Sequence, residues 1–403
     1  MTSLALAEKD MPKSNIEVLI VKADSPLRQL MGTWVEHLGY QVHFASNGRE
    51  AIAVLAKSAI SIVISDWAMP EMDGIALCRE IRKSQPDHYI YIILMSGNLL
   101  KGDFIEAMNA GADDFAQKPL DFDHLVVRLH AARRVIELEQ GLKAEHKHLK
   151  QLYRQMETEL QAAARLQIEL LPADRSYGNM HLRSLLVPAS IISGDCHNHF
   201  ALPGGKILAY QADIAGHGIT AALLSVALQR TLTPSFCCSS NGEVLQAAQI
   251  VQRLNTRLLS NTDTPEYFTL FLAIVSPDTG LISFCQAGHP QPALLRADGS
   301  VEWIGDNGFP VGMLAEAEYE DGACQLAPGD RLMIFSDGVS ECPNPSGDQL
   351  GCERLDDMLR ISAMQREPDG AGTETQILQR LRSWHGGDAF PDDVSMLSIN
   401  AGS

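Results

Sequence analysis

The sequence predicts a multidomain chain in which an α/β domain, a helical connector and an α+β domain follow one another. Three observations predict it. Strand-like runs alternate with amphipathic helices over residues 16–130, apolar residues recur at heptad spacing over 135–170, and many strand-like runs with a few helices fill 172–403. The 403 residues suffice for two domains and a connector. We expect the connector to span 131–171 and residues 1–15 to be disordered.

The first domain is predicted to be a parallel sheet with helices on both faces, because strands and helices alternate along it. The expected strands cover residues 16–21, 41–45, 61–65, 89–95 and 114–116, and the expected helices include 26–38 and 48–57. In sheets of this kind the functional groups collect at the carboxyl ends of the strands.

Those strand ends carry Asp66, Ser96 and Lys118, which could accept, orient and neutralise a phosphoryl group. The segments Asp66-Trp67-Ala68-Met69-Pro70, Met95-Ser96-Gly97, Gly111-Ala112-Asp113-Asp114-Phe115 and Lys118-Pro119 resemble those of a two-component receiver domain. The resemblance implies a flavodoxin-like fold, Asp66 as the phosphorylated residue, and Ser96 and Lys118 as its switch partners. It also allows a cognate histidine kinase as a partner.

Two adjacent positions depart from the receiver pattern. Receivers place two acids after the first strand to hold Mg²⁺, whereas here Val21 is followed by Lys22 and Ala23, and only then by Asp24. Lys22 would place an ammonium group near Asp66. Two interpretations stay open. The receiver is poorly phosphorylated or signals without phosphate, or Asp24 replaces the missing ligand after a small loop shift. A receiver Mg²⁺ is therefore in doubt.

The connector is charged, contains no proline before Pro172, and shows a heptad pattern. The first core position holds Val135, Leu142, Leu149, Met156, Ala163 and Leu170, and the second holds Leu138, Glu145, Leu152, Glu159 and Leu166. This pattern predicts a parallel coiled coil and a homodimer formed through 135–170, weakened by the two glutamates. The alternative is a single amphipathic helix that lies on either domain.

The last part of the chain is predicted to be α+β, because runs of strands are separated by helices. The expected strands cover residues 182–186, 206–212, 269–275, 281–286, 293–296, 331–335 and 394–399, and the expected helices cover 221–231, 243–258 and 376–383.

Acidic residues mark several strand edges in this domain. Asp195, Asp213, Asp337 and the pair Asp392-Asp393 each lie at the end or the start of an apolar run. Mg²⁺ and Mn²⁺ prefer oxygen ligands, so converging carboxylates could form a two-metal centre that acts on a phosphoryl group. The alternative is that these are turn residues of an ordinary domain.

Five motifs in order resemble the metal-dependent type 2C (PPM) protein phosphatases of the SpoIIE-like subfamily. They are Ser193-Gly194-Asp195, Asp213-Ile214-Ala215-Gly216-His217-Gly218, Ala287-Gly288-His289-Pro290, Ser336-Asp337-Gly338 and Asp392-Asp393-Val394-Ser395. The resemblance implies a β-sandwich flanked by helices and two Mn²⁺ or Mg²⁺ ions. It implies that Asp213 bridges the ions with the Ile214 carbonyl as a further ligand, that Asp195 binds one ion, and that Asp337 and Asp392, preferred to Asp393, bind the other.

The histidines of this domain are open to different interpretations. His217 could protonate the leaving group or could simply hold the turn with a hydrogen bond. His289 is expected to pack beside the site. His197 and His199 are expected to be surface residues, because hard cations seldom need imidazole ligands.

Composition limits the function further. The net charge of −18 argues against binding nucleic acid or an anionic membrane. The eight cysteines include no Cys-x-x-Cys pair, which favours reduced thiols and a cytoplasmic location.

The sequence therefore predicts a response regulator whose output is metal-dependent dephosphorylation of phosphoserine or phosphothreonine on a partner protein. The resemblance implies a STAS-type anti-sigma-factor antagonist as that partner. The alternative is a receiver-linked, non-catalytic scaffold that binds the same partner. The four acids at 195, 213, 337 and 392 argue against the scaffold, because binding alone would not need them.

Overall fold

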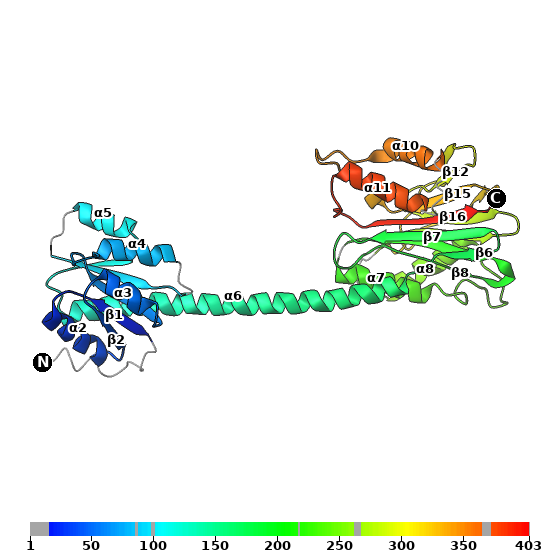
Figure 1. The fold of residues 1–403 in the computed structure, drawn as a ribbon. Helices are drawn as coiled ribbons and strands as arrows, with labels where there is room; N and C mark the ends of the chain where they lie inside the picture. The colour runs from blue at the N-terminus through cyan, green and yellow to red at the C-terminus, as the bar shows by residue number, and fades with distance from the viewer. Residues whose placement is uncertain are drawn as a thin grey trace. The chain divides into compact units, whose positions relative to one another are not determined.

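The computed structural model describes residues 16–84, 88–97, 101–216, 218–261, 267–364 and 372–402. The chain divides into two compact units, with the boundary in the sequence between Arg154 and Gln155; Figure 1 shows the elements of each. None of the helices in these ranges combines the length and the apolar character needed to cross a membrane.

The first unit is an α/β domain with a five-stranded parallel sheet in the order β2-β1-β3-β4-β5. Its strands are β1 (Glu17–Val21), β2 (Gln41–Ala45), β3 (Ile60–Asp66), β4 (Tyr91–Ser96) and β5 (Asp114–Gln117). Its helices are α2 (Ser25–His37), α3 (Gly48–Leu55), α4 (Gly74–Ser84), α5 (Lys101–Asn109) and the first part of α6 (Phe122–Leu170). The predicted α/β class is confirmed.

Helices bury both faces of this sheet. Successive side chains along each strand alternate between the two faces, so each strand contributes to both cores. Val18 and Ile20 of β1 pack in one core with α2 and with Leu125 and Leu129 of α6. Leu19 of β1 packs in a second core with α3, α4 and α5. This double burial explains why the strands appear in the sequence as almost continuous apolar runs.

Helix α6 is a single helix of 49 residues and begins earlier than the predicted connector. Its first turns place Leu125, Leu129, Ala132 and Ile136 against the sheet at helical spacing. Beyond them, the heptad leucines Leu138, Leu142, Leu149 and Leu152 are exposed in the single chain. The coiled coil and the homodimer stay predictions.

The second unit is a sandwich of two antiparallel sheets. One sheet has the order β14-β11-β10-β9-β8, and the other has the order β13-β12-β15-β16-β7-β6. The strands of the first are β8 (Cys196–Ala201), β9 (Ile207–Ile214), β10 (Phe268–Ser276), β11 (Leu281–Ala287) and β14 (Gly322–Gln325). The strands of the second are β6 (Arg175–Tyr177), β7 (Met180–Val187), β12 (Ala293–Leu295), β13 (Val301–Trp303), β15 (Arg331–Phe335) and β16 (Val394–Ala401).

Helices cover the outer faces of the sandwich (Figure 1). They are α7 (Ile219–Thr231), α8 (Ala247–Asn261), α10 (Gly351–Met364) and α11 (Thr373–His385), with a 3₁₀ turn at Pro203–Gly205 and the short α9 (Asp337–Ser340). Helices α7 and α8 share a core with the first sheet, and α10 and α11 share a core with the second. A third core, which includes Phe271 and Leu397, lies between the sheets. The predicted β-sandwich flanked by helices is confirmed.

The prediction that His197 and His199 are surface residues is wrong. They are only 1% and 5% exposed. His197 pairs with Gln211 across β8 and β9, and Gln211 reaches Ser395 of the opposite sheet, so this face of β8 points into the sandwich. Burial lowers the pKa of His197 to about 4, so the ring is neutral at physiological pH.

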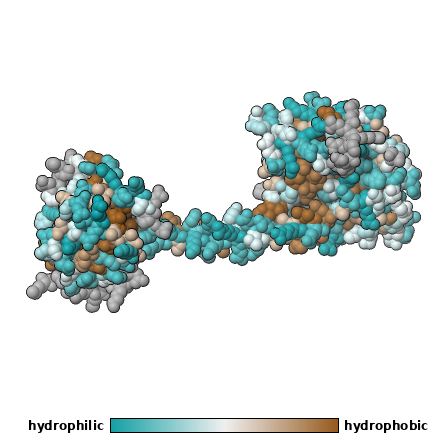
Figure 2. All heavy atoms as spheres, in the orientation of Figure 1, coloured by the Kyte–Doolittle hydropathy of each residue, from teal (hydrophilic) through white to brown (hydrophobic). Residues whose placement is uncertain are grey.

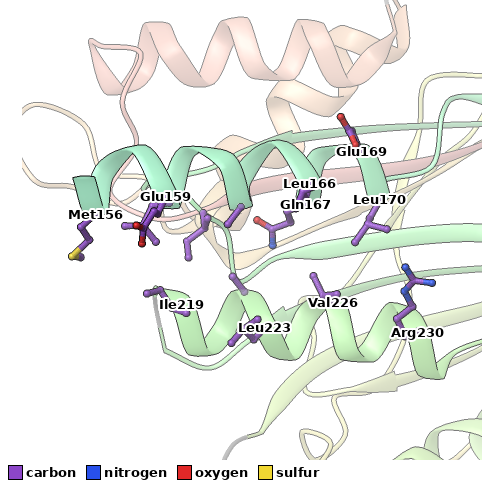
Figure 3. A pocket seen from close by; sticks show the side chains of 14 residues that line it. Met156, Glu159, Leu166, Gln167, Glu169, Leu170, Ile219, Leu223, Val226 and Arg230 are labelled. Atoms are coloured by element: carbon purple, nitrogen blue, oxygen red, sulfur yellow. The ribbon is translucent and has the colours of Figure 1, made fainter. Parts of the chain in front are cut away.

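An apolar groove lies within the second unit between the end of α6 and α7. Its volume is about 710 Å³. Figure 3 shows Leu166 and Leu170 of α6 above Ile219 and Leu223 of α7, and Figure 2 shows hydrophobic side chains gathered at the surface beside this end of α6. The groove places the end of the connector beside the helix that follows the Asp213 turn.

Candidate metal centre and receiver site

The fold brings the predicted acids of the second unit to one end of the sandwich. Asp213 is the penultimate residue of β9, and Asp195 precedes its neighbour β8. Asp337 begins α9 directly after β15, and Asp392 precedes β16, which pairs with β15. Strands from both sheets therefore present carboxylates toward a common region.

The electrostatics of these acids show that they interact. Burial is the main cause that raises the pKa of Asp213 to about 7, and the negative charge on Asp337 is the second. Burial, followed by the charge on Asp213, raises the pKa of Asp195 well above its usual range. Burial, followed by the charge on Asp392, also raises the pKa of Asp337. Acids that repel one another in this way are stabilised by a cation placed among them.

Asp393 holds the segment that carries Asp195. Its Oδ2 accepts hydrogen bonds from Ser193 Oγ and from the Gly194 amide, both at 2.7 Å, and its Oδ1 accepts from the Ala189 amide at 2.7 Å. Asp392 differs because it is exposed, and its Oδ1 accepts a hydrogen bond from the Asp393 amide at 2.8 Å. The two neighbouring acids thus have different surroundings.

A polar chain crosses the sandwich and ends on Asp195. Gln211 Nε2 donates to Ser395 Oγ at 2.8 Å, and Ser395 Oγ donates to Asp195 Oδ2 at 2.6 Å. All three residues are buried. The hydrogen bond from Ser395 to Oδ2 therefore fixes the orientation of the Asp195 carboxylate group.

Gln167 near the end of α6 is a site residue that the sequence reasoning missed. Its Nε2 donates to the Ser193 carbonyl at 2.7 Å and to Ser225 Oγ of α7 at 3.0 Å, and its Oε1 accepts from the Ser193 amide at 3.1 Å. Figure 3 shows the side chain pointing from α6 toward α7. The heptad pattern of the connector gave no signal of a partner 26 residues away.

Two glycines lie at close backbone approaches, and the one at Gly338 leaves no room for a side chain. A Cβ on Gly338 would lie 2.1 Å from the Asp393 carbonyl oxygen, and a Cβ on Gly194 would lie 3.3 Å from the Ile214 carbonyl oxygen. These glycines let the segments that carry the acids meet. The Ile214 carbonyl therefore lies beside the Asp195 segment, and its role as a metal ligand stays a prediction. His217 lies outside the described residues.

The donor set fits a hydrated divalent cation. Within the described ranges, no three or more His, Cys, Asp or Glu side chains form a group able to hold a metal ion by themselves. Mg²⁺ commonly keeps several waters and uses only one or two carboxylates. The mutually repelling carboxylates of Asp195, Asp213 and Asp337 supply oxygen ligands of that kind.

The predicted receiver residues of the first unit also come together. Asp66 ends β3, and its two oxygens contact Lys22 Nζ at 2.8 Å and Lys118 Nζ at 2.7 Å. Ser96 ends the neighbouring strand β4 and accepts the Lys118 amide on its carbonyl at 2.8 Å. Asp24 is exposed and caps helix α2, because its Oδ1 accepts the Leu27 amide at 3.1 Å.

Comparison with known families assigns both units. Residues 18–130 match the response regulator receiver domain, and residues 203–401 match stage II sporulation protein E (SpoIIE). Residues 18–130 are therefore a response regulator receiver domain, and residues 203–401 are a SpoIIE-type domain of the PPM phosphatase class.

Individual relatives agree with this assignment. The chain is 25% identical over 268 residues to protein IcfG of Synechocystis, an alignment that covers 60% of this chain and 41% of IcfG. It is 27% identical over 209 residues to phosphoserine phosphatase RsbU of Bacillus subtilis, covering 50% of this chain and 59% of RsbU. The chain spans about half the length of the curated relatives it matches.

A solved structure supports the fold of the second unit. The SiaA-PP2C domain of Pseudomonas aeruginosa superposes with a TM-score of 0.54 at 20% identity, covering 62% of this chain and 98% of that domain.

Proposed function

We propose that this chain is a response regulator whose output is the metal-dependent hydrolysis of phosphoserine or phosphothreonine on a cytoplasmic partner protein. The observation that carries the proposal is a group of acids, one buried and two half-buried, whose burial and neighbouring charges raise their pKa values. Such a group is costly to fold without a cation. Similarity to RsbU, a phosphoserine phosphatase, supports the choice of substrate.

Each acid has a distinct part in this proposal. Asp213 and the Ile214 carbonyl would hold two divalent cations, Mn²⁺ or Mg²⁺, with Asp195 on one and Asp337 and Asp392 on the other. Bound there, the cations supply positive charge for the phosphoryl oxygens and activate water. Asp392 is favoured over Asp393, since both oxygens of Asp393 are already occupied by hydrogen bonds to residues 189–194.

The protein contributes rigidity to this chemistry. The chain from Gln211 through Ser395 fixes Asp195 from one side, and Asp393 fixes its backbone from the other. Positioned ligands reduce the reorganisation needed during reaction. We also propose that a STAS-type anti-sigma-factor antagonist is the substrate and that residues 135–170 form the homodimer contact.

The test is hydrolysis of p-nitrophenyl phosphate by the full chain with Mn²⁺. We expect metal-dependent turnover that falls at least about 100-fold in Asp213→Ala, because one metal-site group commonly supplies several kcal/mol. Asp306→Ala is the matched control, since Asp306 is an exposed acid of the same unit, and it should retain wild-type turnover. Turnover that survives in Asp213→Ala contradicts the proposal, and a chain that is inactive on both p-nitrophenyl phosphate and phosphoserine peptides favours the scaffold.

A further inference from the structure

The surroundings of Asp66 in the receiver domain bear on whether this residue can be phosphorylated, a question separate from the proposed phosphatase activity. Asp66 is enclosed by two ammonium groups, with Lys22 Nζ 2.8 Å from Oδ2 and Lys118 Nζ 2.7 Å from Oδ1. Lys22 and Asp66 are each only 5% exposed, so little water screens the contact between them. The prediction that Lys22 lies near Asp66 is confirmed.

The backbone holds Lys22 in this place. Lys22 follows β1 directly, and its amide donates to the Ala45 carbonyl at 3.0 Å. Its own carbonyl accepts a hydrogen bond from the Arg28 guanidinium on α2. The Lys22 backbone is therefore held on two sides, and the buried ion pair with Asp66 holds the ammonium itself.

The residues present do not fit the Mg²⁺ that receivers use. Ala23 has no side-chain oxygen at the position where receivers carry a metal ligand. Asp24 is turned away, because its carboxylate caps α2 through the Leu27 amide, and a move toward Asp66 would leave the helix uncapped.

We propose that the Lys22 ammonium takes the place of the receiver's divalent cation, so that Asp66 stays neutralised without metal and does not accept phosphate from Mg²⁺-dependent donors. Phosphoryl transfer would require an Asp66 oxygen to attack phosphorus while a divalent ion screens the phosphoryl oxygens. Here both oxygens are held in ion pairs, and the ammonium occupies the space beside them.

The experiment measures labelling of the full chain by ³²P-acetyl phosphate with and without Mg²⁺. We expect no Asp66-dependent label on the wild type. The double variant Lys22→Asp/Ala23→Asp restores two acids after β1 and should gain Mg²⁺-dependent labelling at least 10-fold above the wild type. The gain should disappear when Asp66→Asn is added. Lys57→Asp, a matched change at an exposed lysine of the same unit, should gain nothing.

Two results overturn the proposal. One is Mg²⁺-dependent labelling of the wild type that Asp66→Asn abolishes. The other is a double variant that retains the wild-type circular dichroism spectrum but gains no label, because Lys22 is then not what replaces the metal. If the double variant fails to fold, Lys22→Gln/Ala23→Asp replaces it, since the amide removes the charge at similar size and the aspartate supplies a carboxylate for Mg²⁺. Its Mg²⁺-dependent label should then exceed that of the wild type, and a folded Lys22→Gln/Ala23→Asp chain without label also overturns the proposal.

Discussion

Gln167→Met should raise the Mn²⁺ concentration needed for activity. Methionine keeps the length of the side chain but removes the amide that donates to the Ser193 carbonyl and to Ser225, and that accepts from the Ser193 amide. Ser225 keeps a partner, because its hydroxyl also donates to the Ala222 carbonyl. The Ser193 amide and carbonyl lose the contacts to α6 that fix the segment leading to Asp195.

The magnitude follows from those two backbone groups. A buried polar group without a partner costs about 1–3 kcal/mol, so the two together cost about 2–6 kcal/mol in the ordered form of the segment. If only about 2 kcal/mol of this cost opposes metal binding, the Mn²⁺ concentration at half-maximal rate rises about 30-fold. The rate at saturating Mn²⁺ should change much less, because Gln167 positions a ligand and does not touch the substrate.

The assay is a Mn²⁺ titration of p-nitrophenyl phosphate hydrolysis by the full chain. Gln161→Met is the matched control, because Gln161 lies on an exposed part of the same helix and should titrate as the wild type does. A half-maximal Mn²⁺ concentration for Gln167→Met within twofold of the wild type would refute the reasoning. So would a loss confined to the saturated rate.

The remaining predictions concern the acids and the first unit. Asp213→Asn should stabilise the metal-free protein at pH 8 by about 2 kcal/mol, within the roughly 4 kcal/mol that a three-unit pKa shift represents. Because the folded pKa of Asp213 is raised to about 7, this cost is absent below pH 4, grows as the pH rises, and is complete above pH 7. Asp392→Asn should lower the affinity for Mn²⁺ with little change in the midpoint of thermal unfolding. Asp393→Asn should lower both the affinity for Mn²⁺ and the unfolding midpoint. Arg82→Met should destabilise the first unit by about 2–4 kcal/mol, because Arg82 binds Asp113 and the Ile90 and Gly111 carbonyls.

Each of these has a direct check. Urea unfolding without metal tests Asp213→Asn, and equal stability of variant and wild type at pH 4 and pH 8 contradicts it. Calorimetric Mn²⁺ titration combined with thermal unfolding tests the Asp392 and Asp393 pair, and identical effects of the two variants count against their separate roles. Unfolding of Arg82→Met beside the exposed control Arg79→Met tests the last prediction, and equal midpoints contradict it.

The elements that could be predicted well are those whose burial is evident from the pattern of neighbouring residues in the sequence. Strand β3 is buried throughout as a nearly continuous apolar run, and the acids could be placed because each follows or precedes such a run. Lys22 was also predictable, because parallel strands β1 and β3 end at the same edge. The failures depend on contacts between distant segments. His197 and His199 look like the polar face of an edge strand, but the second sheet covers them.

The missed contact of Gln167 has the same cause. A glutamine in a charged helix is ordinarily a solvated residue, and only the packing of α6 on α7 buries this one. The start of α6 at Phe122 was missed because the apolar spacing that packs on the receiver sheet continues without a break into the heptads.

The central claim is that the acids around Asp213 bind divalent cations that support phosphoester hydrolysis. Its most direct measurement is the rate of phosphoserine-peptide hydrolysis by the full chain across a Mn²⁺ titration, for the wild type and Asp213→Asn. The account predicts a rate that rises with Mn²⁺, saturates, and returns to baseline with EDTA, and a variant at baseline at every Mn²⁺ concentration. A wild-type rate that does not depend on metal, or a variant that titrates as the wild type does, contradicts it.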